Sequence, residues 1–247
     1  MNGLYIDSVR LNYDKVKQTS LDKYPLNIKC IKNLDKIEFK NRVTFLVGEN
    51  GIGKSTFIEA LALKVGLNPE GGTQNTTFST YDDYSELEKY LWVSKFGIPK
   101  TKFFLRAESF YNVASAIDRD YLADLKYQYG GSLHECSHGE SFIQLVKNRF
   151  TDHGLYILDE PEAALSPTRQ MTLLKYIDML AKEGSQFIIA THSPILIAYR
   201  DGIILDLNNN FKETKYEDTQ IYNTYMQFIN KPEKMQEILL DGIDEID

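Results

Sequence analysis

The chain has 247 residues, of which 43% are hydrophobic and 26% are charged, a composition typical of a folded globular protein. Its 35 acidic and 28 basic residues give a net charge of −7, which argues against a surface built to coat nucleic acid. The longest apolar runs are far shorter than the ~20 residues of a membrane span, and the N-terminus shows no apolar signal segment. Two cysteines, Cys30 and Cys136, make no disulfide framework. We therefore expect a cytoplasmic protein with no membrane insertion.

Hydrophobic periodicity predicts an α/β order of elements in the first part of the chain. Alternating apolar residues predict a strand near the N-terminus, and the apolar spacing of Ile58, Leu61 and Val65 predicts a helix face. In chain order we expect a strand within 4–11, strands at 37–39 and 43–47 joined by a tight turn, a helix over 54–64, an irregular connection over 66–84, a short helix over 85–94, a strand at 103–105 and a helix over 112–127.

The second part of the chain predicts a parallel crossover followed by a hairpin and a helix. Residues 155–158 and 187–189 are continuous apolar runs, typical of strands covered on both faces. Between them Leu173, Ile177 and Leu180 form a helical stripe, so the two strands should be parallel. A hairpin is expected over 203–207 and 211–216, and a C-terminal helix should align Tyr222, Met226 and Ile229.

A glycine-rich segment follows the strand at 43–47 and opens the helix at 54–64. It reads Gly48-Glu-Asn-Gly-Ile-Gly53-Lys54-Ser55 and fits the phosphate-binding pattern G-x-x-x-x-G-K-[ST] in its required strand–loop–helix context. The glycines let backbone N–H groups surround a phosphate, Lys54 would reach the β- and γ-phosphates, and Ser55 would ligate Mg²⁺. The nucleotide-binding residues predicted here are Gly48, Asn50, Gly51, Gly53, Lys54, Ser55 and Thr56.

Two later strands end in polar residues that suit nucleotide hydrolysis. Asp159 and Glu160 follow the apolar strand at 155–158; Asp159 is placed to hold Mg²⁺ and Glu160 to take a proton from the attacking water. His192 follows the next strand and could hydrogen-bond a γ-phosphate oxygen or that water. The alternatives are that the two carboxylates form an acidic helix N-cap and that His192 is structural.

A further segment lies 22 residues before Asp159, counted from Ser137. Cys136-Ser137-His138-Gly139-Glu140 resembles the L-S-G-G-Q/E signature of ABC-type ATPases, although Cys136 and His138 replace the usual Leu and Gly. In that family the signature of one protomer caps the γ-phosphate held by the other, which would make Ser137, Gly139 and Glu140 nucleotide-binding residues. The alternative is an ordinary capping box, with Ser137 and Glu140 at a helix start.

The resemblance covers about residues 4–207 and extends to other motifs. Pro161–Ser166 looks like the D-loop, and the whole is similar to the soluble, non-transporter branch with RecF-type, SMC-type and overcoming-lysogenization-defect ATPases, above all to small bacterial single-domain predicted ATPases. It implies a P-loop fold with a mixed, mostly parallel sheet, an antiparallel N-terminal part and a helical insertion. It also implies one domain over 1–247, with a signature subdomain at about 81–150. No glutamine ends the strand at 103–105, where Arg106 and Glu108 are the local polar residues.

These motifs favour a cytoplasmic ATPase that binds ATP and Mg²⁺, dimerises around the nucleotide and switches a separate protein or nucleic-acid partner. Two alternatives remain: the nucleotide-binding subunit of an ABC transporter, and a nucleotide-gated regulator with little turnover. DNA is suggested by the SMC- and RecF-type resemblance and by one basic run, although such a run is usually a solvated face. The run consists of Lys29, Lys32, Lys36, Lys40 and Arg42.

Overall fold

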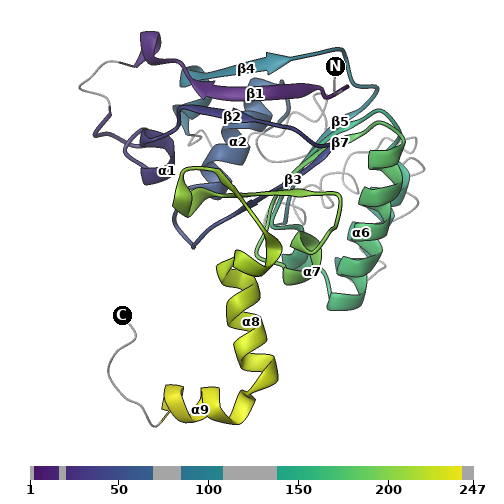
Figure 1. The fold of residues 1–247 in the computed structure, drawn as a ribbon. Coiled ribbons are helices and arrows are strands. Elements are labelled where there is room, and N and C mark those ends of the chain that lie inside the picture. The colour runs from purple at the N-terminus through teal and green to yellow at the C-terminus, as the bar shows by residue number, and fades with distance from the viewer. Residues whose placement is uncertain (1–2, 17–20, 69–84, 108–137, 241–247) are drawn as a thin grey trace.

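The computed structural model describes residues 3–16, 21–68, 85–107 and 138–240. Its strands form two sheets, and helices flank both (Figure 1). The strands are β1 (Ile6–Leu11), β2 (Lys36–Glu38), β3 (Val43–Val47), β4 (Leu91–Lys95), β5 (Lys102–Arg106), β6 (Leu155–Asp159), β7 (Gln186–Ala190), β8 (Ile203–Asp206) and β9 (Lys212–Thr214). The α-helices are α1 (Lys29–Lys32), α2 (Lys54–Lys64), α5 (His138–Arg149), α6 (Pro167–Lys182), α7 (Pro194–Ile197), α8 (Gln220–Asn230) and α9 (Pro232–Leu240). The 3₁₀ helices are η1 (Tyr13–Lys15), η3 (Glu86–Tyr90), η5 (Pro161–Ala164), η6 (Leu207–Asn209) and η7 (Tyr216–Asp218).

The larger sheet has six strands in the order β5-β6-β7-β3-β8-β9. All neighbours in it are parallel except β8 and β9, which form the predicted antiparallel hairpin. Every residue of β3, β6 and β7 is buried, as their uninterrupted apolar sequences predicted. Arg106 pairs with Asp159, and Asp159 with Ala190, so these strands end at one common edge. Loops that follow the strands therefore meet at that edge.

The smaller sheet is antiparallel, in the order β2-β1-β4, and lies over α2 (Figure 1). A core of apolar residues fills the space between this sheet, α2 and the larger sheet. The side chain of Gln186, at the start of β7, joins the two sheets. Its Oε1 accepts from the N–H groups of Tyr5 (2.8 Å) and Ile6 (2.9 Å), and its Nε2 donates to the carbonyl of Ile6 (2.8 Å). The antiparallel part is thus fixed to the central strands.

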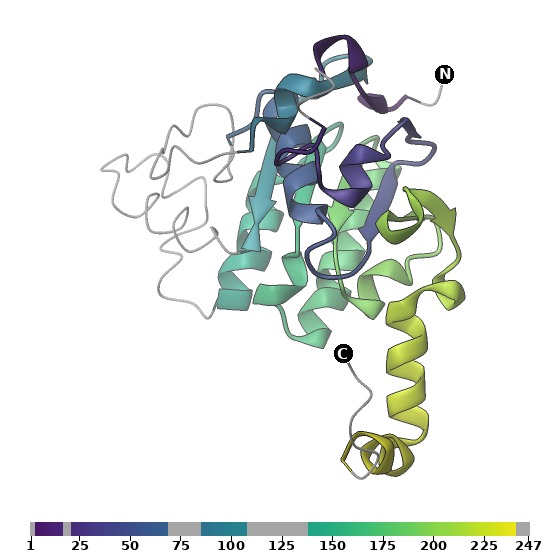
Figure 2. The ribbon, with the colours of Figure 1, turned by 90° about the vertical axis from the view of Figure 1, so that its left-hand side faces the viewer.

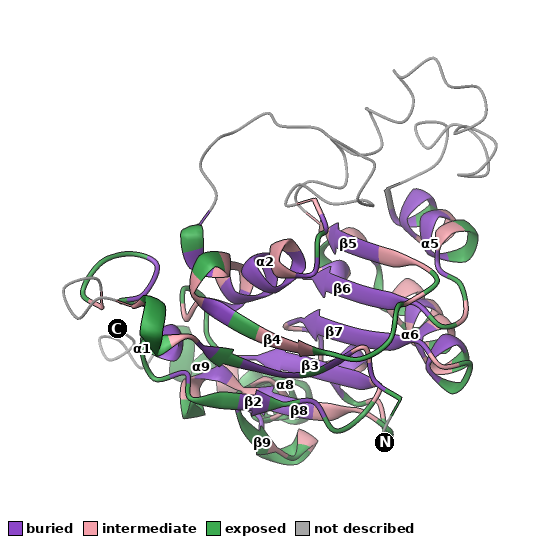
Figure 3. Cartoon of the chain, turned by 90° about the horizontal axis from the view of Figure 1, so that it is seen from above, coloured by how far each residue is buried: buried purple, intermediate pink, exposed green. Residues whose placement is uncertain are grey.

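The opposite face of the larger sheet packs against α5, α6 and α7 around a second apolar core. Phe150, directly after α5, stacks on Tyr156 of β6 with ring centroids 4.1 Å apart. In Figure 3 the central strands have the colour of buried residues, since α2 and the smaller sheet cover one face and α5, α6 and α7 the other. The predicted fold class is confirmed: a mixed, mostly parallel sheet with an antiparallel N-terminal part.

Two local predictions are wrong. Residues 37–39 and 43–47 do not form a paired hairpin, because β2 pairs with β1 in the small sheet whereas β3 pairs with β7 and β8. Residues 85–94 form η3 and then β4 rather than one helix. The β-forming Leu-Trp-Val sequence pairs with β1, where Trp92 lies under the guanidinium of Arg10 at 4.6 Å, so tertiary pairing overrides the helical spacing. The helix expected over 112–127 and most of the connection at 66–84 lie outside the described residues.

The chain ends in two helices that project from the body. α8 leaves the lower edge of the molecule in Figure 1 and α9 turns sideways from its end, as Figure 2 also shows. Neither helix contains a buried residue. Across the four described ranges, no helix is both long and apolar enough to cross a bilayer.

Candidate functional site

The glycine-rich segment lies at the common edge, between β3 and α2, and its conformation requires glycine. Gly51 has φ +78° and Gly53 has φ +107°, the left-handed region that side chains disfavour. Gly53 is also the residue before α2 and packs closely, since a Cβ there would lie 2.6 Å from Ile28 Cγ2. The segment therefore folds into a tight loop whose backbone leads into the positive end of α2.

Lys54 places its ammonium group inside this loop. Its Nζ donates to the carbonyls of Gly48 (2.9 Å) and Glu49 (3.0 Å), and the residue is only 4% exposed. Burial lowers the pKa of Lys54, while the carboxylates of Glu160, Asp159 and Glu162 oppose that shift. A cation held by neutral carbonyls beside loop N–H groups is chemically suited to a phosphate.

Ser55 and Asp159 bring two hard oxygen donors together from different elements. The hydroxyl of Ser55, in the first turn of α2, donates to Oδ1 of Asp159 at the end of β6 over 3.2 Å. No cluster of three or more His, Cys, Asp or Glu side chains that could hold a metal occurs in the described part of the chain. Mg²⁺ needs only one or two protein oxygens, because it keeps several waters and takes phosphate oxygens. The Ser55–Asp159 pair fits that ion, and Thr56 follows it in α2, half-buried.

Glu160 and His192 lie beside this pair. Glu160 has φ +47°, an uncommon conformation for a residue other than glycine, and its side chain remains 42% exposed. His192 Nε2 lies 3.8 Å from Glu160 Oε1, beyond hydrogen-bond distance, and this buried nitrogen has no hydrogen-bond partner within the described residues. Burial, then the charge of Lys54, lowers the pKa of His192, whereas Glu160 opposes that. The imidazole is therefore neutral at pH 7, and such a ring can donate a hydrogen bond from one nitrogen and accept one at the other.

The loop that carries His192 is held from behind by Glu162 of η5, a contact that the sequence reasoning missed. The backbone N–H of His192 donates to the Glu162 carboxylate. Burial raises the pKa of Glu162, and this hydrogen bond opposes the rise. Ser193 Oγ donates to Gln170 Oε1 of α6 over 2.6 Å and caps α7. The only sequence signal was the position of Glu162 two residues after Glu160.

Arg106 occupies the end of β5, where the resembled family has a glutamine. Its Nη1 donates to Glu59 Oε2 of α2 at 3.1 Å, and its Nε lies 3.6 Å from Asp159 Oδ2. Burial raises the pKa of Glu59, and the guanidinium charge is the main opposing influence. Arg106 therefore contacts two carboxylates, that of Glu59 and that of Asp159 in the Ser55–Asp159 pair. Glu108 lies outside the described residues.

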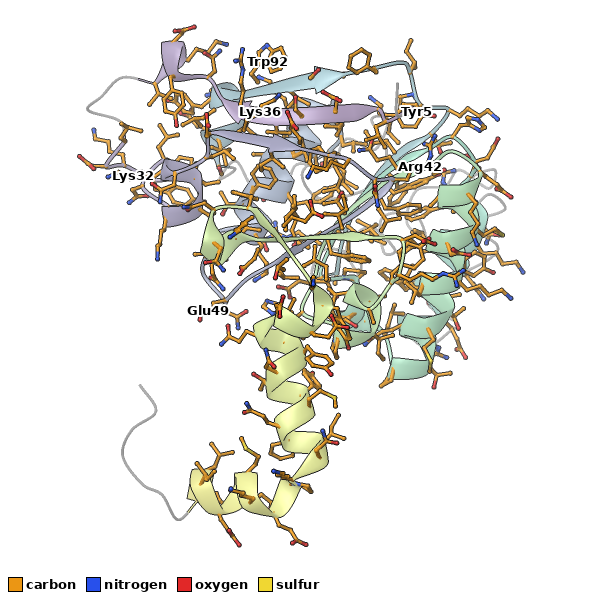
Figure 4. All side chains as sticks on the ribbon, viewed as in Figure 1. Tyr5, Lys32, Lys36, Arg42, Glu49 and Trp92 are labelled. Atoms are coloured by element: carbon orange, nitrogen blue, oxygen red, sulfur yellow. The ribbon has the colours of Figure 1, made fainter. Side chains whose placement is uncertain are left out.

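A cleft of about 510 Å³ opens beside the loop. Figure 4 shows Glu49 of the loop at the lower edge of the body, near the start of α8. Gly48, Glu49 and Asn50 of the loop line the cleft together with Glu160 and His192. The other lining residues are Val47 of β3 and, from the C-terminal part of the chain, Asp206, Asn208, Thr219, Gln220, Ile221, Thr224 and Tyr225.

The signature segment is only partly described. Ser137 lies outside the described residues, as does the side chain of His138 at the start of α5. Gly139 packs against η5 and α6: a Cβ there would lie 3.0 Å from the carbonyl oxygen of Ala164 and 2.8 Å from Arg169 Nη1. Glu140 Oε1 forms an ion pair with Arg169 Nη2 at 2.8 Å. Gly139 and Glu140 are thus supported by their own chain on the flank that carries α5.

The basic run near the N-terminus is largely engaged within the chain. Lys32, Lys36 and Lys40 form ion pairs with Asp22, Glu38 and Glu213, respectively. The guanidinium of Arg42 donates to the carbonyls of Gly3 and Gly184. Figure 4 labels Lys32, Lys36 and Arg42 on different parts of the upper body. These contacts favour a solvated, internally paired surface over a phosphate-binding stripe.

Comparison with known protein families finds two partial matches. A family model described as "AAA domain, putative AbiEii toxin, Type IV TA system" matches residues 132–198. A second model, described as "AAA domain", matches residues 26–103. The first covers the signature, η5 and β7 with His192, and the second covers the phosphate loop.

Similar curated proteins are ATP-binding proteins of transporters. The ribose import ATP-binding protein RbsA of Bacillus cereus is 29% identical over an alignment of 194 residues, and the match covers 66% of this chain and 36% of the relative. An uncharacterized ABC transporter ATP-binding protein of Haemophilus influenzae is 28% identical over an alignment of 198 residues, and the match covers 70% of this chain and 72% of the relative. This chain thus spans about a third of the RbsA protein that it matches.

Similar solved structures include the SMC head domain from Thermotoga maritima, with a TM-score of 0.45 and 14% identity over 82% of this chain and 94% of that one. Another is cbiO1 from Clostridium perfringens, part of the ABC transporter complex cbiONQ, with a TM-score of 0.46 and 18% identity over 96% of this chain and 99% of that one. At these scores the fold assignment depends on the strands and loops described above.

Proposed function

We propose that this chain, an ATPase domain of the ABC type, hydrolyses Mg·ATP in a site shared by two copies and uses the cycle to switch a separate partner protein in the cytoplasm. ATP is its nucleotide and Mg²⁺ its metal, as in other domains of this class. The observation that carries the proposal is the placement of Glu160 and His192. Both line the same cleft as the phosphate loop, with their side chains 3.8 Å apart.

In this proposal each residue of the site has one task. The loop N–H groups and Lys54 bind the phosphates, and the Ser55 hydroxyl and Asp159 carboxylate hold Mg²⁺, which neutralises charge on the phosphate oxygens. Glu160 takes the proton of the attacking water on its carboxylate. His192, neutral because of burial, orients that water or a phosphate oxygen, and Glu162 keeps its backbone in place. Arg106 positions Asp159 through its guanidinium.

The division of the predicted site within one chain supports the proposed dimer. The loop and the catalytic pair share one cleft, whereas Gly139 and Glu140 pack against η5 and α6. In the resembled family the signature of one copy faces the loop of the other, so a two-fold pair completes both sites. ATP then favours the dimer because its γ-phosphate is held from both sides, and hydrolysis releases it.

The alternative of a transporter subunit has one supporting observation, the names of the curated relatives. Against it stands Arg106, which takes the position of the glutamine that the resembled transporters carry and which forms ion pairs inside the chain. Copurification with a membrane protein would favour the transporter alternative. The nucleotide-gated regulator is disfavoured by the open, catalytically suitable position of Glu160.

The test compares wild-type protein with Glu160→Gln and Lys54→Ala. We expect Glu160→Gln to bind ATP as tightly as wild type and to lose at least about 100-fold in turnover, because an amide cannot accept the proton. Lys54→Ala should bind ATP at least about tenfold more weakly, equivalent to ~1.4 kcal/mol. Glu183→Gln, an exposed change of the same kind at the end of α6, is the matched control.

Light scattering of the same proteins measures the dimer. Glu160→Gln should be a dimer in ATP and a monomer in ADP, and Ser137→Arg in that background should prevent dimerisation while preserving ATP binding. Wild-type turnover in Glu160→Gln would contradict the assignment of the base. A monomer in ATP, or a dimer that survives Ser137→Arg, would contradict the shared site.

A further inference from the structure

Side chains of alternating charge extend from the predicted metal pair toward α2. Oδ1 of Asp159 accepts from the Ser55 hydroxyl at 3.2 Å, and Oδ2 of the same carboxylate lies 3.6 Å from Arg106 Nε. Nη1 of Arg106 in turn donates to Glu59 Oε2 at 3.1 Å. The ends of β5 and β6 thus meet α2 through these side chains (Figure 3). One guanidinium therefore links two carboxylates, of which one is predicted to hold Mg²⁺.

Glu59 is a buried carboxylate with partners on two elements. It lies one helical turn after Ser55 in α2, so both side chains project from the same face of that helix. The residue is 9% exposed, and the backbone N–H of Ser85, just before η3, donates to its carboxylate. Arg106 of β5 makes the other contact. Because a buried carboxylate is costly unless a cation neutralises it, Glu59 and Arg106 fix each other in place.

The guanidinium of Arg106 lies beside the carboxylate that would hold the metal. The side chain of Asp159 is 4% exposed and that of Arg106 is 27% exposed, so solvent screens their charges only weakly. A cation next to Asp159 offsets the negative charge that attracts Mg²⁺, and Lys54 of the loop adds a second positive charge nearby. Without a nucleotide, Asp159 should therefore bind Mg²⁺ weakly, and phosphate oxygens must supply the remaining negative charge.

Glu59 limits how far Arg106 weakens the metal site. Its negative charge compensates the guanidinium, so that Asp159 keeps part of its attraction for a divalent cation. Without Glu59, an uncompensated cation would lie beside Asp159 and oppose Mg²⁺. Without Arg106, the two carboxylates would attract a divalent cation even when no nucleotide is bound. The pair therefore sets the charge of the metal site between these two extremes.

We propose that Arg106 and Glu59 are positioning residues that make Mg²⁺ binding conditional on the nucleotide. The guanidinium holds Asp159 and keeps free Mg²⁺ from the empty site, and Glu59 compensates that charge enough for the metal to bind together with the triphosphate. The proposal rests on the proposed function, because it takes Asp159 as the metal-holding carboxylate of a Mg·ATP site. It assigns a separate task to the residue that replaces the glutamine of the resembled family.

The test uses the full chain with Glu160→Gln, which prevents turnover, as the parent. Arg106→Gln removes the cation, Glu59→Gln removes its counter-charge, and the double variant removes both; Arg106→Lys retains the positive charge. Glu86→Gln, which takes a carboxylate from the exposed ion pair with Lys89, is the matched control. Thermal unfolding is measured first. Binding of Mn²⁺ to the nucleotide-free proteins is then followed by electron paramagnetic resonance, and ATP dissociation constants are measured in Mg²⁺ and in EDTA.

The two single variants should change metal binding in opposite directions. Arg106→Gln should bind Mn²⁺ without nucleotide at least about fivefold more tightly than the parent, because a cation beside Asp159 is lost. In Glu59→Gln, the factor by which Mg²⁺ strengthens ATP binding should fall at least about fivefold, without weaker binding in EDTA. The double variant should return toward the parent in both measurements. Arg106→Lys and the control should bind free Mn²⁺ as weakly as the parent.

A pair that only supports the fold would give a different pattern. Weaker metal binding in both single variants and in the double variant, with lower thermal stability, would overturn the proposal. Metal binding that is the same in all variants would also overturn it, and either result leaves the proposed function intact. A parent that binds ATP no more tightly in Mg²⁺ than in EDTA would overturn the proposed Mg·ATP site and, with it, this inference.

Discussion

Gly53 and Gly139 are both expected at the phosphates, yet the structure requires glycine at each for a different reason. Gly53 has a left-handed backbone, and a side chain there would also collide with Ile28 behind the loop. Gly139 belongs to a regular helix, and a side chain there would meet Arg169 and the Ala164 carbonyl on neighbouring elements. Gly53 is therefore required by its backbone conformation as well as by its packing against Ile28, whereas Gly139 is required by its packing.

This difference indicates how each half of the proposed site tolerates change. A substitution in the loop should lower stability and ATP binding together, because the loop conformation, the Lys54 contacts and the contact with Ile28 depend on one another. The start of α5 should be more adaptable, because the atoms nearest to Gly139 include the far end of a flexible arginine. Substitutions at the two glycines test this contrast directly.

The largest effect is expected from Gly53→Ala. The left-handed conformation and the 2.6 Å approach to Ile28 Cγ2 together should lower the free energy of unfolding by about 2–4 kcal/mol. ATP binding should be lost in parallel. Gly51→Ala is the matched control, because Gly51 has φ +78° but no atom within 4 Å of its Cβ position. Denaturant unfolding and ATP titration measure both; equal costs at the two positions would refute the role of Ile28.

A smaller effect is expected from Gly139→Ala. Arg169 can move, and alanine favours a helix, so we expect a loss of about 1 kcal/mol or less in unfolding free energy. ATP binding by the single chain should be unchanged, whereas the ATP-dependent dimer should weaken. Arg169→Ala removes the closest contact, so Gly139→Ala should cost less in an Arg169→Ala background than in wild type. Loss of ATP binding by the monomer would contradict the separation of the two halves.

The smallest effect concerns the pH dependence of stability. It tests the half of the proposed site around the loop, where His192 is the partly buried titratable side chain. The pKa of His192 is lowered by burial, so the unfolded chain takes up this proton before the folded one as pH falls below ~6.5. Stability attributable to a neutral His192 is therefore lost on acidification from pH 7 to 5. His192→Gln should flatten that decline by about 1 kcal/mol or less. Denaturant unfolding of wild type and His192→Gln at pH 7 and pH 5 measures the difference, and an equal decline in the two proteins would contradict it.

The central sheet and the residues at its edge were predictable because each signal was local. Continuous apolar runs specified β3, β6 and β7, and the strand ends placed Asp159 and His192 on the same edge as Lys54. Parallel pairing then brings the ends of successive strands together without further information.

The contacts that hold this edge were not predictable, because each joins residues far apart in the sequence. Arg106 and Glu59 are 47 positions apart, and the His192 amide and Glu162 are 30 apart. Nothing in the local pattern around Glu59 distinguishes it from an exposed helix residue. β4 was mistaken for helix for the same reason, since its partner β1 lies some 80 residues earlier, as the pairing of Arg10 with Trp92 illustrates.

The buried thiol of Cys30 makes opening of the phosphate loop measurable by its chemical labelling. The thiol donates to the carbonyl of Ile52 over 2.8 Å behind the loop, and burial raises its pKa to about 12. A thiol reagent at neutral pH therefore meets neither a thiolate nor an accessible sulfur until the loop opens. In a chain with Cys136 replaced by serine, the rate of Cys30 labelling would report how often the loop opens. A ligand that binds and stabilises the closed loop would lower that rate.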